Sequence, residues 1–216
     1  MKTSLILLAS FITTAVSAAQ LHLVTVNAPA YNCLFSPDCI ITVNETLSPF
    51  TTNLPPSAGL NGSLSGFLQS RTFQGEKNSP EAGLYGYEYR LVLNQIVAAD
   101  TVSIRSMTIN FPTYSKFNFQ TQMDKQVWAV TSGSIGTIGP SVVKFSKKKV
   151  TFQFDPPLVL SITNAPEVSS YFFGMVSSNP PPYTPNGWAT FSGTVKPTPK
   201  SSAISFDYLT VPVRTP

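Results

Sequence analysis

The sequence has few of the side chains that attack substrates or hold metal ions. It contains one histidine and two cysteines, and its ten acidic residues are scattered along the chain. A Ser-His-Asp or Cys-His arrangement would therefore have to use His22, which we interpret as a surface or edge-strand residue near the mature N-terminus. No Asp-rich calcium loop is found. The sequence thus predicts no metal and no cofactor, and it argues against an enzyme more than for one.

Charge is also scarce, which bears on the choice of partner. Charged residues make up 11% of the chain, and the formal net charge is +4. The basic cluster consists of Lys144 and Lys147–Lys149, between Val143 and Val150. Short runs of this kind are usually solvated, so we expect a hairpin tip and no nucleic-acid partner. Weak attraction to an anionic polymer or a cell envelope is the alternative.

Long apolar runs are missing except near the N-terminus. There Lys2 precedes the apolar stretch Leu5–Val16, and Val16-Ser17-Ala18 ends in small residues suited to signal peptidase. The stretch is too short for a membrane span, and we expect no transmembrane segment in the mature chain. Residues 1–18 are therefore predicted to be a signal peptide outside the fold, and residues 19–216 to be secreted. The location would be extracellular, or periplasmic in a Gram-negative host.

Export gives the two cysteines a role. Cys33 and Cys39 are expected to form a disulfide in an oxidising compartment, with Pro37 and Asp38 turning the chain between them. Closing so short a loop stabilises a fold by about 2 kcal/mol in the loop-entropy estimate. Their spacing differs from that of zinc sites, so we expect no metal on this pair.

A sustained helical period is absent, and 19 prolines leave few windows long enough for a helix. Alternation with period two is strong instead. In Leu84–Val97 three tyrosines fall on one face, while Glu88 and Arg90 fall on the other, wetter face. About eleven such strands, separated by turn residues, predict an all-β fold. We expect a single antiparallel β-sandwich over residues 19–216, with a closed β-barrel as the alternative.

Several local features are predicted within this fold. A slip in the apolar phase indicates a β-bulge near Arg105-Ser106. Ile40–Val43 is predicted as a strand and Pro49–Ser57 as a linker. Pro156-Pro157 is expected to end the strand that starts at Lys149, since proline cannot donate to a ladder. The last residues, 214–216, are expected to be frayed.

Aromatic residues give the positive indication of binding. Tyr183 and Trp188 lie in or beside a proline-rich stretch, Pro180–Trp188, that favours a stiff loop. Rigid aromatic side chains on a sandwich loop can stack on sugar rings. The alternative is that Trp188 begins a strand and is buried under Tyr183.

Scattered acids still leave glycoside hydrolysis open, because that reaction needs only two carboxylates. Glu88 is the best acid on a strand, and Glu76 and Glu81 flank a turn. The alternative is an exposed ion pair for Glu88 and surface solubility for the other two. Separately, Asn44 and Asn61 occupy N-glycosylation acceptor patterns, which matter only in a eukaryotic host.

Three stretches carry a resemblance. They are Gly66–Phe73, Ala82–Arg90 and Ser170–Ser177, and together they resemble a group of secreted bacterial β-rich proteins of unknown function. The resemblance implies a bacterial source and transfers no activity or site residue.

These observations predict a secreted, non-enzymatic β-sandwich. We expect it to bind an extracellular glycan or protein, or to contribute to an envelope or matrix surface. A carbohydrate-active enzyme with paired carboxylates is one alternative, and a structural or partner-docking module is another.

Overall fold

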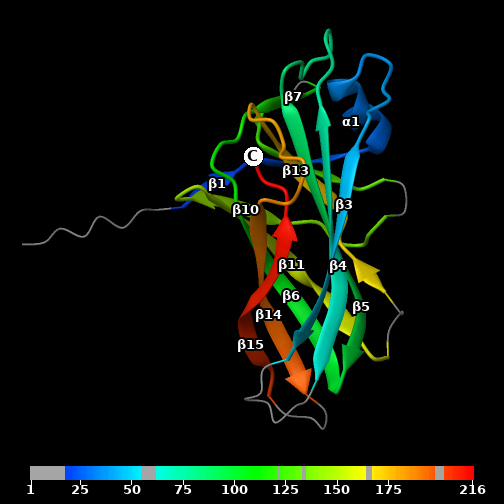
Figure 1. Ribbon diagram of the computed structural model, residues 1–216, viewed down its shortest axis with the longest axis vertical. Coiled ribbons are helices and arrows are strands. Elements are labelled where there is room, and N and C mark those ends of the chain that lie inside the picture. The colour runs from blue at the N-terminus through cyan, green and yellow to red at the C-terminus, as the bar shows by residue number, and fades with distance from the viewer. Residues whose placement is uncertain (1–17, 55–61, 121, 133–134, 164–166, 198–201) are drawn as a thin grey trace, which may run out of the picture.

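The computed structural model describes residues 18–54, 62–120, 122–132, 135–163, 167–197 and 202–216. Apart from Ala18, the predicted signal peptide lies outside the described residues, as does Asn61. Two large β-sheets pack against each other and are called sheet A and sheet B (Figure 1).

Sheet A has six strands in the order β1-β10-β11-β6-β14-β15, and neighbouring strands are antiparallel. Their bounds, in that order, are Ala19–Leu21, Val142–Ser146, Lys149–Ser161, Ala99–Asn110, Gly187–Pro197 and Ile204–Val213.

Sheet B has the order β2-β9-β13-β5-β4-β3, with the short strand β12 also pairing with β5. The bounds are Leu23–Val26, Val127–Val130, Phe172–Ser177, Tyr85–Val97, Ser63–Gln74 and Asn44–Asn53, with Val168–Ser169 for β12. Strands β2 and β9 are parallel, so this sheet is mixed and not purely antiparallel. Strands β7 (Phe117–Phe119) and β8 (Gln122–Lys125) form a separate ribbon.

The main core lies between the two sheets and is built from the faces that alternate with period two. Tyr87, Tyr89 and Leu91 of β5 are buried there together with Met107 of β6 and Phe191 of β14. Both sheets are open in the part of the chain that the structure describes. The predicted β-sandwich is therefore confirmed, and the closed barrel is wrong.

Two local predictions are confirmed as well. The register of β6 against β14 shifts between Ser192 and Gly193, which leaves Arg105 as the extra residue of a bulge. Lys147 and Lys148 join β10 to β11 as a hairpin tip, with φ angles of 49° and 65°. Two consecutive positive φ angles are what a tight type I′ hairpin turn requires.

Two strand predictions are wrong. Ile40–Val43 is irregular, and β3 runs instead from Asn44 to Asn53, through part of the predicted linker. This is possible because β3 is an edge strand, where the missing N–H of Pro49 is tolerated. Strand β11 also continues past Pro156-Pro157, because its register against β6 is interrupted there.

The expectation that the C-terminal residues are frayed is wrong. Arg214 and Thr215 are buried. The guanidinium of Arg214 donates from Nη1 to Thr72 Oγ1 at 3.2 Å and to the Asn44 carbonyl at 3.3 Å. Its own carbonyl accepts from the hydroxyl of the buried Tyr89 at 2.9 Å. These contacts fasten the end of β15 to sheet B.

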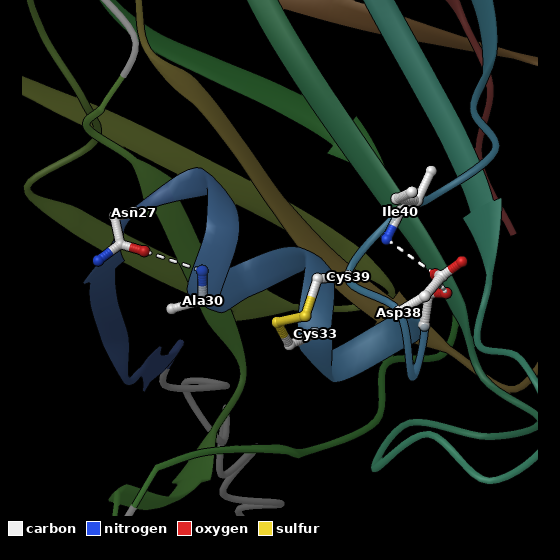
Figure 2. Close-up of a disulfide and its surroundings, with 7 residues drawn as sticks. Asn27, Ala30, Cys33, Asp38, Cys39 and Ile40 are labelled. Atoms are coloured by element: carbon white, nitrogen blue, oxygen red, sulfur yellow. Dashed lines mark hydrogen bonds between the residues drawn. A yellow bond between two sulfur atoms is a disulfide. The ribbon is translucent and has the colours of Figure 1, made fainter.

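Helix α1, Ala28–Phe35, is missing from the sequence predictions. Its signal is local: Asn27 caps the helix, accepting from the Ala30 N–H at 2.9 Å, and a proline stands in the first turn (Figure 2). An eight-residue helix shows little periodicity, because it spans only about two turns.

Helix α1 covers part of the outer face of sheet B, the face turned away from the main core (Figure 1). Tyr31 and Phe35 pack on the indole of Trp128, with ring centroids 5.0 and 6.0 Å away. They belong to a second buried cluster of aliphatic and aromatic residues from α1, β2, β4, β7, β9 and β13. The part of the outer face of sheet B beneath α1 is therefore a second core and not the wetter face expected.

Cys33 of α1 and Cys39 of the following loop form the predicted disulfide (Figure 2). Within this loop the Asp38 carboxylate accepts from the Ile40 N–H at 3.0 Å. The bridge joins the C-terminal part of α1 to the segment that leads into β3, so it restrains the helix more than the sandwich.

Replacing both cysteines, Cys33→Ser with Cys39→Ser, is expected to lower the free energy of unfolding by about 2 kcal/mol, because the short loop gains entropy when unfolded. Urea denaturation should give the same free energy of unfolding for the variant and for the reduced wild type. Both proteins should keep the β-sheet signal in circular dichroism. Loss of cooperative unfolding would show instead that the bridge holds the sandwich together.

Candidate functional site

Both aromatic residues singled out for binding are exposed. Trp188 is 61% exposed at the start of β14, and Tyr183 is 88% exposed in the segment before it. The burial considered for Trp188 is therefore wrong. Asn186 holds this segment in place: its side chain donates to the Thr215 carbonyl at 3.1 Å and accepts from the Thr215 N–H at 2.9 Å.

Trp188 stands on the outer face of sheet A, which is rich in small hydroxyl side chains. Four threonines align across adjacent strands in one row: Thr151, Thr108, Thr190 and Thr210. The hydroxyls of Thr108 and Thr151 are 2.9 Å apart. In the next row toward the bulge, the hydroxyls of Ser106 and Ser192 are 2.6 Å apart. Hydroxyls paired in this way are held in fixed positions.

Three depressions on this face are lined by residues that the structure describes. A depression of about 340 Å³ is lined by Trp188 together with Asn110, Asn186, Lys149, Thr108 and Thr190, among others. A second, of about 320 Å³, shares Thr108 and Lys149 with the first and adds Lys144 and Lys147. A third, of about 680 Å³, lies at the bulge beside Arg105 and Asp207. The face thus combines an exposed indole, hydroxyl and amide groups, and lysines at one end.

Glu88 lies on the opposite side of the sandwich, on the outer face of sheet B. It is only 3% exposed, so the exposed ion pair expected with Arg90 is wrong. Arg90 instead has its guanidinium 3.7 Å from Glu167 and donates to Ser169 Oγ at 3.0 Å. The Glu88 carboxylate accepts from the indole Nε1 of Trp128 at 2.9 Å.

A glycine allows this contact. Gly174 of β13 stands between Glu88 of β5 and Trp128 of β9 in the pairing register. A Cβ at Gly174 would come within 2.7 Å of the Trp128 ring, so any side chain there would displace the indole. The indole therefore reaches across β13 to the carboxylate.

The same row continues on the other side of Glu88. Arg71 of β4 is its register neighbour, and Glu45 of β3 is next. Arg71 Nε donates to Glu45 at 2.6 Å, and its guanidinium lies 4.0 Å from the centre of the Phe172 ring. Glu88 therefore has the charged Arg71 on one side and the indole of Trp128 on the other.

The environment shifts the pKa values of these groups. Burial raises the pKa of Glu88, against the opposing effects of the Trp128 hydrogen bond, the Arg71 charge and the Tyr31 hydroxyl. Burial also raises the pKa of Tyr31, to which the nearby Glu88 charge contributes. For Glu45, partial burial acts upward, but hydrogen bonds from Arg71 and Gln69 outweigh it and lower the pKa.

The other candidates are more scattered. Glu81 is buried and raises the pKa of Tyr31, so it is no mere solubility residue, whereas Glu76 is exposed. His22 is exposed between β1 and β2.

Tyr31 and Arg71 were not singled out in the sequence. The i, i+3, i+4 spacing of Tyr31, Leu34 and Phe35 after the Asn-Ala-Pro signal was the available clue for Tyr31.

Among the described residues, no three His, Cys, Asp or Glu side chains are grouped as metal ligands. Likewise, no helix in the described part of the chain has the length and apolar character needed to cross a bilayer.

No family model matches the chain, and neither the curated proteins nor the solved structures contain a match.

The raised pKa of Glu88 predicts a measurable pH effect. An acid whose pKa is higher in the folded state stabilises the fold while protonated, and this contribution falls as pH rises above its unfolded pKa, about 4.5. Glu88→Gln retains an acceptor for Trp128 but cannot ionise. The stability of wild type relative to Glu88→Gln should therefore decline as pH rises from 4.5 toward the folded pKa.

Urea midpoints of the two proteins from pH 4 to pH 8 measure this difference. Because both proteins contain the same other carboxyl groups, the comparison cancels the contributions of those groups to the pH dependence of stability. Glu45 is one of them, and its lowered pKa makes the fold more stable as pH rises. A difference that stays constant over this range would contradict the assignment.

Proposed function

We propose that this protein is an exported, non-enzymatic module that binds an extracellular polysaccharide through the outer face of sheet A. The exposed indole of Trp188 carries the proposal, because it stands at the edge of a depression lined by threonine and asparagine side chains. The apolar faces of sugar rings stack on aromatic side chains, and their hydroxyls exchange hydrogen bonds with hydroxyl and amide groups.

The dimensions favour a polymer over a single sugar. The threonine row crosses β14, β6 and β11, and Lys144 of β10 continues it beyond Thr151. Three strand spacings separate β14 from β10, which is about 14 Å. The lysines at the β10 end of the face favour a polymer that carries carboxylate or sulfate groups.

Export supports the same proposal. The predicted signal peptide would deliver the chain to the compartment in which such polymers occur, and the Cys33–Cys39 disulfide is consistent with an oxidising environment. Hydrolysis by paired carboxylates receives less support, because Glu88 is on the opposite side of the sandwich from Trp188 and is covered by α1.

Trp188→Ala is expected to weaken polysaccharide binding by about tenfold or more, since each tenfold loss corresponds to about 1.4 kcal/mol and an exposed aromatic anchor supplies at least that much. Tyr183→Ala is expected to have a smaller effect. A glycan array and affinity electrophoresis with neutral and uronate-containing polysaccharides measure these losses.

The matched control is Ile162→Ala. Ile162 is also a large exposed apolar residue, at 60%, but it lies in the turn after β11, outside the three depressions. The control should bind like wild type. Absence of binding to every glycan, or equal binding by Trp188→Ala and the control, would reject the proposal.

A further inference from the structure

The outer face of sheet B contains a small cavity that the proposed function does not use. It has a volume of about 140 Å³ and lies between α1 and the sheet. Tyr31 of α1, Arg71 of β4, Glu88 of β5 and Phe172 of β13 line it, together with apolar side chains that include Ile41 and Val130. For scale, an apolar cavity of about 150 Å³ accepts a molecule of the size of benzene.

Two buried polar groups meet at this cavity. The Glu88 carboxylate receives the Trp128 indole N–H at 2.9 Å. The Tyr31 hydroxyl is buried and has no partner in good hydrogen-bond geometry, but it interacts weakly with the Glu88 carboxylate, and this interaction contributes to the pKa of both groups. A buried hydroxyl with only a weak hydrogen bond costs free energy, which a ligand in the cavity would recover.

The charges around the cavity do not balance when its carboxylates are ionised. Arg71 is bonded to Glu45 at 2.6 Å, so its positive charge is already compensated. Arg90, which follows Glu88 on β5, forms an ion pair with Glu167. When Glu88 is ionised, the single guanidinium of Arg71 therefore faces two carboxylates, those of Glu45 and Glu88. The site is short of one positive charge.

We propose that this cavity binds a small primary amine, whose ammonium group lies against Glu88 and Tyr31 and whose apolar body, of about the size of benzene, packs on Phe172, Val130 and Ile41. The ammonium donates to the Glu88 carboxylate and to the Tyr31 hydroxyl oxygen. Arg71 beside the site discriminates against a second positive charge on the ligand.

Three probes of similar shape test the charge preference directly: cyclohexylamine, cyclohexanol and cyclohexanecarboxylate, each titrated by calorimetry into the full mature protein. We expect the amine to bind at least about tenfold more tightly than the alcohol, and the carboxylate to bind most weakly. Glu88→Gln should remove the preference for the amine and leave the affinity for the alcohol unchanged. Ile162→Ala, on a distant turn, should bind all three like wild type.

The dependence on pH gives a second readout on the wild-type protein alone. The amine stays protonated up to a pH of about 10, as lysine does, whereas Glu88 must lose its proton to pair with it. Affinity for the amine should therefore increase as pH rises from 5 to 8, and this increase should be absent in Glu88→Gln. The titratable and charged groups around Glu88 are Tyr31, Arg71, Glu45 and Glu81.

Each other result would overturn the proposal. Equal affinity for the alcohol would identify an uncharged apolar cavity, and preference for the carboxylate would identify an anion site on Arg71. Binding of none of the probes would mean that Glu88 serves only the fold. If Glu88→Gln fails to fold, the comparison of probes and the pH series on wild type still decide. The outcome is independent of polysaccharide binding, which uses the opposite face.

Discussion

The hydrogen bond from Trp128 to Glu88 is the constraint on which the outer layer of sheet B depends. A buried indole N–H can only donate and a buried carboxylate needs donors, so each of the two groups would be costly without the other. The bond crosses β13 only because Gly174 has no side chain. Tyr31 and Phe35 then pack on the indole and hold α1 against the sheet. Burial of the helix and the cavity follow from this arrangement, and the burial of Glu88 raises its pKa although the hydrogen bond itself lowers it.

The sandwich thereby presents two outer faces of different chemistry. Helix α1 covers part of sheet B, and a small cavity beneath it is lined by the buried carboxylate of Glu88. The outer face of sheet A carries rows of hydroxyl groups with the exposed Trp188 at one end. The main core between them is apolar and specifies neither face, since strand alternation turns every second side chain outward. We therefore propose that the outward residues carry the function, with a polysaccharide bound on sheet A and a small primary amine on sheet B.

The inner faces of the strands were predictable from the sequence, whereas the outer faces were only partly so. Period-two alternation identified β5, β6 and β11, and the slip in phase located the bulge at Arg105. Alternation does not distinguish an outward residue in water from one under a helix, and for that reason Glu88 was expected to be exposed. The sequence did not predict helix α1, because eight residues show little helical periodicity of their apolar side chains. The remaining signal was confined to Asn27 and a proline in the first turn. Tertiary contacts also determined the C-terminus, where Arg214 reaches across to sheet B.

The chain has two tryptophans, and they occupy the two faces, so their indole N–H resonances in one ¹H–¹⁵N spectrum test the account most directly. One indole, that of Trp188, should exchange rapidly with solvent. The other, that of Trp128, should be protected, and its chemical shift should change as Glu88 ionises above pH 4.5 but stay constant in Glu88→Gln. Two indoles that exchange equally fast, or a protected indole whose shift is unaffected by Glu88→Gln, would contradict the account.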